Sequence, residues 1–177
     1  MGVVWARVRE LQLPSYIPNV GHAASYAAIG LCFIFAFRAR LLGRLPRFPA
    51  FDPLHEAAFR AWAAIYTGAF LLGNNYDYRL IFLIPTVPLL MTLSRNGNSI
   101  LAICAKASMI TIVASLCYPW IRWSLQDAIP YGRVITYAID ESTNWTLFAL
   151  LIFLQFCSLP DWMFKPGEWR GIIFSRR

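Results

Sequence analysis

The sequence predicts an all-α integral membrane protein with five transmembrane helices, and three features carry that prediction. The chain of 177 residues is 58% hydrophobic and 14% charged, whereas soluble domains of this size carry about 25% charged residues. Its apolar residues come in long blocks rather than with the period of a half-buried strand or helix. No apolar core directly follows Arg7, Arg9 and Glu10, so we expect a retained first helix instead of a cleaved signal peptide.

The first two crossings are expected over residues 20–37 and 57–73, because a spanning helix needs about 20 mostly apolar residues. Before the second, "FDPLHEA" places Asp52 to cap the helix and Pro53 in its first turn. Small residues recur along both helices at Ala23, Ala27, Gly30, Ala57, Ala61 and Gly68. These small faces fit packing against each other and packing against a partner's helices equally well.

The third crossing is expected over residues 78–94 and contains Pro85 and Pro88. Both prolines should kink the helix and free backbone carbonyls, which lipid tolerates only where neighbours or water satisfy them. We therefore expect this segment to pack inside the bundle. A re-entrant hairpin is the alternative, since the apolar run is short for a crossing.

The last two crossings are expected over residues 99–121 and 145–162, joined by an outer loop at 122–144 that should hold an interfacial helix and a turn. The chain then divides into three parts. Residues 1–19 form an N-terminal interfacial segment, residues 20–163 a polytopic membrane domain, and residues 164–177 a basic cytoplasmic tail.

Lysine and arginine residues set the expected orientation, because cytoplasmic loops carry more of them. One side takes ten: Arg38, Arg40, Arg44, Arg47, Arg60, Arg95, Lys165, Arg170, Arg176 and Arg177. The other side takes five: Arg7, Arg9, Arg79, Arg122 and Arg133. This bias predicts the N-terminus outside and the C-terminus inside a bacterial cytoplasmic membrane. Because the basic residues flank apolar runs, the formal charge of +7 indicates membrane lipids as partners and not nucleic acid.

Five residues are candidates for binding lipids or a partner. Asn74 to Arg79 should form a turn on the outer side, in which Asp77 either caps the third helix or, with Arg79, acts in catalysis. Lys106 is the one charge well inside an apolar run, so it should snorkel to the cytoplasmic face or pair with a phosphate. The lipid or partner candidates are Tyr78, Arg79, Lys106, Trp120 and Trp123.

A cofactor has little support in the sequence. His22 lies among small residues and is a weak candidate ligand for a pigment. The four cysteines form no CxxC pair and sit in apolar runs, as small buried residues do. We expect bound lipids and no metal, and the sequence contains no nucleotide-binding or hydrolase motif.

The segment "GNNYDYRLIFLIPTVPLL" resembles the C-terminal part of bacterial GT-C-type membrane glycosyltransferases, which use polyprenol-phosphate sugars. The resemblance covers about residues 70–90, with weaker similarity to residue 162. It implies an outer-face site for a lipid-linked sugar phosphate, with Asp77, Tyr78 and Arg79 at the matching positions.

The chain also departs from that family, whose members have about twice as many helices and an acidic residue in the first outer loop. Glu10 is the only carboxylate of its outer N-terminal segment, so the resemblance implies descent more than activity. We therefore expect a non-catalytic subunit that packs against a larger membrane complex, with respiratory and photosynthetic assemblies as candidate hosts. The alternative is a glycosyltransferase, whole or half of a split pair, acting on a lipid-linked sugar.

Overall fold

The computed structural model confirms an all-helical chain. It describes residues 16–49, 51–72, 77–97, 99–125, 128, 132–160 and 163, and within these it describes the backbone alone at 16–22, 25, 77–79 and 134. These residues contain five α-helices and one 3₁₀-helix, and no strand. In chain order the elements are α2 (Tyr16–Leu41), α3 (Pro53–Leu71), η1 (Asp77–Thr86), α4 (Val87–Ser94), α5 (Ile100–Leu125) and α6 (Gly132–Ser158).

The start of α3 confirms the expected cap. Asp52 Oδ1 accepts a hydrogen bond of 2.9 Å from the backbone N–H of Leu54, and Pro53 occupies the first turn. A carboxylate here satisfies one of the free amide groups at the helix start, and Pro53 has no amide hydrogen to leave unsatisfied. The helix boundary therefore follows from the sequence itself.

The third segment is one continuous helical run that changes from a 3₁₀-helix to an α-helix. Residues 77–86 form a 3₁₀-helix that contains Pro85, and α4 begins at the next residue with Pro88 in its first turn. Two prolines so close together each remove a backbone donor. The buried hydroxyl of Thr86, between the two prolines, donates to the carbonyl of Leu83 at 2.6 Å and is thereby satisfied. The helical run over 77–94 agrees with the helix expected over residues 78–94, and Asp77, expected in the preceding turn, is its first residue.

The expected outer loop at 122–144 is also wrong in its extent. Helix α5 continues to Leu125, and α6 begins at Gly132. The segment 133–144 reads as a loop because it is polar, but its side chains find partners along the helix. Thr143 Oγ1 donates to the carbonyl of Ile139 at 2.7 Å, and Asn144 Nδ2 donates to Asp140 Oδ1 at 2.9 Å. The hydroxyl bond gives a polar side chain a partner within the helix, and the Asn144–Asp140 pair joins two residues on the same helix face.

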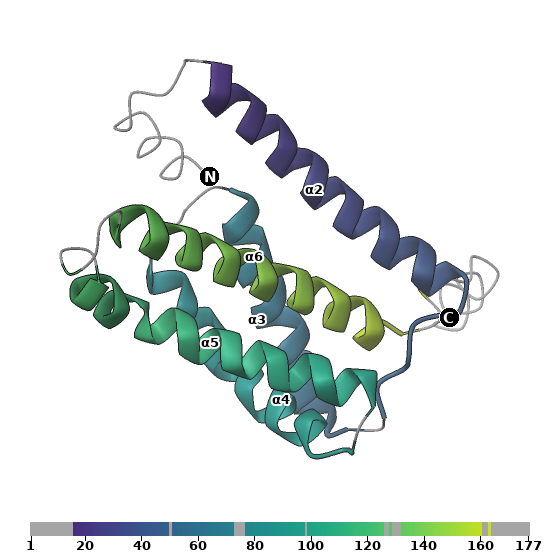
Figure 1. The fold of residues 1–177 in the computed structure, drawn as a ribbon. Coiled ribbons are helices and arrows are strands. Elements are labelled where there is room, and N and C mark those ends of the chain that lie inside the picture. Colours follow the sequence, from purple (N-terminus) through teal and green to yellow (C-terminus); the bar gives the residue numbers. More distant parts are fainter. Residues whose placement is uncertain are drawn as a thin grey trace, which may run out of the picture.

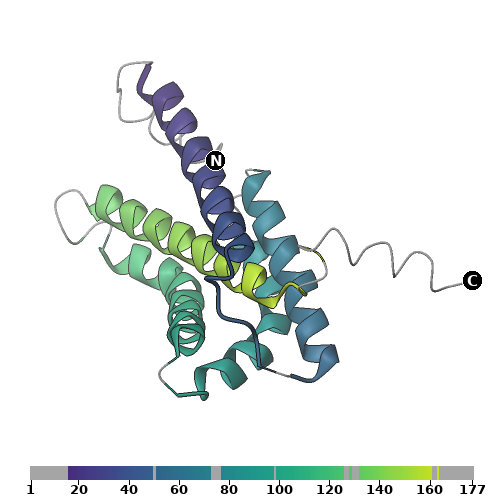
Figure 2. The same ribbon diagram turned by 90° about the vertical axis from the view of Figure 1, so that its right-hand side faces the viewer.

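Helix α6 lies at the centre of the bundle, between α2 and α5 (Figure 1, Figure 2). It runs beside α5, and it is also the main neighbour of α2. Its side chains enter two core clusters, one with α3, η1, α4 and α5, and one with α2 and α3. In the second cluster the rings of Phe70 and Phe148 stack with centroids 4.6 Å apart.

Large apolar side chains cover much of the outer surface of α2 and α5. On α2 the exposed ones are Tyr26, Leu31, Ile34, Phe35, Phe37 and Leu41. On α5 they are Ile100, Ile103, Ile110, Val113, Leu116, Trp120 and Trp123. Among the described helices, α5 is the one long and apolar enough to cross a membrane, and residues 80–94 form a shorter apolar helix.

Candidate functional site

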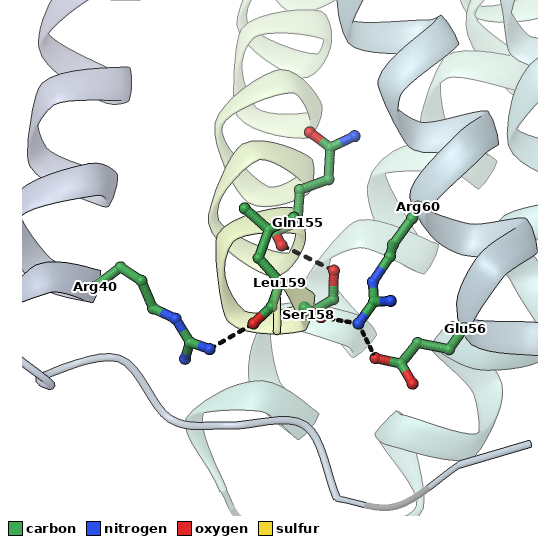
Figure 3. Close-up of polar contacts among 6 residues, drawn as sticks. All are labelled: Arg40, Glu56, Arg60, Gln155, Ser158 and Leu159. Atoms are coloured by element: carbon green, nitrogen blue, oxygen red, sulfur yellow. Dashed lines mark hydrogen bonds and ion pairs between the residues drawn. The ribbon is translucent and has the colours of Figure 1, made fainter. Parts of the chain in front are cut away.

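Two arginines from different helices meet at the C-terminal end of α6 (Figure 3). Arg40, in the last turn of α2, donates from Nη2 to the carbonyl of Leu159. Arg60, in the second turn of α3, donates from Nη2 to the carbonyl of Ser158. The last carbonyls of a helix have no partner within it and carry partial negative charge. The two guanidinium groups therefore cap α6 from both sides.

A carboxylate completes this cluster. Glu56 lies one turn before Arg60 in α3, and its Oε1 accepts from the same Nη2 group. The Arg60 and Glu56 side chains are 35% and 23% exposed, so the ion pair is only partly screened by solvent. The Ser158 hydroxyl donates to the carbonyl of Gln155 at 2.8 Å. The cluster thus ties α2 and α3 to the end of α6, which is a structural task.

The sequence interpretation missed this cluster, because it counted Arg40 and Arg60 only as charges near a loop. One signal was available: Glu56 and Arg60 are four residues apart, the spacing of an ion pair on one helix face. The contacts with Ser158 and Leu159 span 98 and 119 residues. The local sequence contains no pattern that predicts a contact between residues so far apart.

For the catalytic candidates the structure describes only the backbone. Asp77, Tyr78 and Arg79 open η1, and their side chains lie outside the described part of the chain. His22 lies in α2, and its side chain is likewise outside that part.

The other candidates lie on the surface of α5. Lys106 is exposed two turns after the start of the helix. Helical side chains lean toward the N-terminus of their helix, which for α5 is the end nearer Arg95. Lys106 therefore leans in the direction that the expected snorkelling requires, and the snorkelling itself stays a prediction. Trp120 and Trp123 are 71% and 75% exposed in the last turns, where either a lipid interface or a partner could contact them.

The opposite end of the bundle holds two half-buried carboxylates, Asp140 and Glu141, in the first half of α6. Besides the bond from Asn144 to Asp140, the Tyr137 hydroxyl lies 3.4 Å from Glu141 Oε1. The sequence interpretation placed both acids in a loop and so did not consider them as a pair within a helix. Among the residues that the structure describes, no three His, Cys, Asp or Glu side chains converge as a metal site would require.

The described residues thus form a helical bundle with large exposed apolar side chains on α2 and α5, an arginine pair at the C-terminal end of α6 and two half-buried acids in its first half. No family model, no curated protein and no solved structure matches the chain.

Proposed function

We propose that this chain is a small integral protein of the bacterial cytoplasmic membrane and serves as a non-catalytic subunit of a larger membrane complex. The observation that carries the proposal is the apolar outer surface of α2 and α5. Phe35 and Ile34 on α2 are 69% and 55% exposed, and Ile110 on α5 is 70% exposed. In water, burying a large apolar side chain stabilises a protein by about 1.5–3 kcal/mol, and an exposed one does not contribute this free energy. Soluble monomers rarely expose contiguous patches of this kind.

Helix lengths agree with a bilayer. Helices α2, α5 and α6 have 26, 26 and 27 residues, which at about 1.5 Å per residue exceeds the hydrocarbon core of about 30 Å. The η1–α4 run of 10 and 8 residues has a contour length of about 32 Å, because a 3₁₀ coil rises about 2.0 Å per residue. This length favours a full crossing by the third segment over the re-entrant hairpin.

Small residues favour a partner made of helices. Ala23 and Ala27 on α2 are exposed, and a Cβ at Gly30 would meet nothing within 4 Å. On α3, Ala57 and Ala61 are exposed as well. The two small faces are therefore not packed against each other, and they remain available for close approach by another backbone, which is how membrane helices associate.

A lipid-linked-sugar glycosyltransferase is the second candidate. Asp140 and Glu141 are half-buried and lie in the first half of α6. Successive helices alternate in direction, so α3 ends and η1 begins at that same end of the bundle. Carboxylates in such a position suit general acid–base chemistry. In the proposed orientation this end faces outward.

Co-purification tests the proposal. The full chain, tagged and extracted from its own host in mild detergent, should resist a carbonate wash and run with a larger complex in near-stoichiometric amount. Ala27→Leu should weaken that association, because a bulky side chain keeps the partner's backbone away. Ala28→Leu, an exposed neighbour on another side of α2, is the matched control.

Two outcomes would overturn the proposal. A chain released by the carbonate wash is not an integral membrane protein. A stable monomer that transfers sugar from a polyprenol phosphate after extraction would establish the glycosyltransferase instead.

A further inference from the structure

The connection between α2 and α3 is anchored to the core by every third side chain. Leu45, Phe48 and Phe51 pack against the main core cluster. The ring of Phe48 lies 5.9 Å, centroid to centroid, from both Phe51 and Phe59. Gly43, at φ 64°, turns the chain at the end of α2, a conformation that glycine adopts without strain. Residues 42–49 and 51–52 therefore have a defined path across this end of the bundle.

Between these anchors the arginines point outward. Arg44 and Arg47 are exposed, one residue before each of two anchors. Arg38, in the last turn of α2, and Arg95, at the end of α4, are exposed at the same end of the bundle. We call these four arginines the basic end.

Within the described residues 38–60, the two carboxylates, Asp52 and Glu56, are already engaged. Asp52 caps α3 and lies 3.7 Å from His55. Glu56 pairs with Arg60, and Arg40 is turned inward to Leu159. Among the described residues 38–60, arginines outnumber carboxylates, and the excess charge lies on the outward side.

We propose that the basic end binds the headgroups of anionic phospholipids in the leaflet that it faces. This inference rests on the proposed membrane placement. Leu41 and Leu42, which are 53% and 60% exposed beside it, would enter the acyl region of the same leaflet. An arginine near an anionic surface contributes about a five-fold gain in association, equivalent to about 1 kcal/mol. The anchored connection holds Arg44 and Arg47 in place before lipid arrives, so less conformational freedom is lost on binding.

The test uses the full chain reconstituted in phosphatidylcholine bilayers with spin-labelled lipids. Electron paramagnetic resonance then measures the association of labelled phosphatidylglycerol relative to labelled phosphatidylcholine. The wild type should prefer phosphatidylglycerol several-fold, and the preference should fall at high salt as charges are screened. Arg38→Gln with Arg44→Gln removes two of the four charges and should lower that preference markedly. Arg122→Gln with Arg133→Gln, two exposed arginines at the other end, is the charge-matched control and should keep it.

Each other outcome contradicts a definite statement. A wild type that inserts but shows no preference overturns the lipid inference and leaves the membrane placement intact. Equal losses in both double variants would show a general charge effect and no basic-end site. Full competition by soluble glycerol phosphate would indicate a free-phosphate site. Failure to insert into any bilayer overturns the membrane placement itself.

Discussion

Arg40 and Arg60 donate to adjacent carbonyls, those of Leu159 and Ser158, although one arginine comes from α2 and the other from α3. The end of α6 is thus a junction of three helices. In a lipid bilayer, apolar contacts between helices contribute little to their association, because lipid tails are equally apolar. Polar contacts of this kind then contribute a larger share of the stability of the bundle. The first prediction concerns this junction.

Arg60→Ala should destabilise the bundle by about 1.5–3 kcal/mol, the typical contribution of hydrogen bonds to charged groups. It removes a cap from α6 and leaves Glu56 half-buried without its cation. Reversible unfolding of the protein in detergent micelles would measure the change. Arg60→Lys should recover part of it, because the charge returns without the planar fork. Arg133→Ala, which removes an exposed arginine, is the control, and equal stability of the two alanine variants would contradict the capping role.

Asp52→Ala should cost about 0.5–2 kcal/mol, the range for loss of an N-cap side chain. The bond to the Leu54 amide is the contact that disappears. Asp52→Asn should stay close to the wild type, because asparagine caps helices equally well. The same unfolding measurement in micelles separates the two variants, and an equal loss in both would point to charge instead of capping.

Phe148→Ala should cost about 3 kcal/mol, because it opens a cavity in the core and removes a ring stacked on Phe70. Phe35→Ala is the matched control, since its ring is 69% exposed on α2. The free energy of unfolding of the isolated chain should barely change in the control. Comparable losses at the two positions would mean that α2 packs differently from the arrangement in Figure 2.

The orientation can be tested by cysteine labelling in a background without the four native cysteines. Ala128 is an exposed turn residue between α5 and α6 and offers a probe for that end of the bundle. Ala128→Cys should react with an impermeant reagent added outside whole cells. Leu42→Cys, exposed at the basic end, should react only after the membrane is opened. The reverse pattern would invert the proposed orientation.

Much of the architecture could be predicted from local patterns. The apolar blocks predicted five helical segments, and Asp52 with Pro53 predicted the start of α3. The loop at 122–144 could not be corrected from hydropathy, because its polar side chains bond to carbonyls of their own helix. Hydropathy measures how a side chain partitions and does not record such a bond.

By itself, the sequence determined that the chain is helical, where its apolar runs lie, and that arginine gathers at the ends of particular runs. These properties depend on neighbours within a turn or two. Only the tertiary structure decided which arginines cap α6 and which face outward at the basic end. That division depends on the packing of α2 and α3 against α6, which brings Arg40 and Arg60 to carbonyls about a hundred residues away. In the connection between α2 and α3, Leu45 and Phe48 pack against the core, and Arg44 and Arg47 are left exposed. The role of each arginine depends on the groups that it contacts, and here those groups belong to segments that are distant in the sequence.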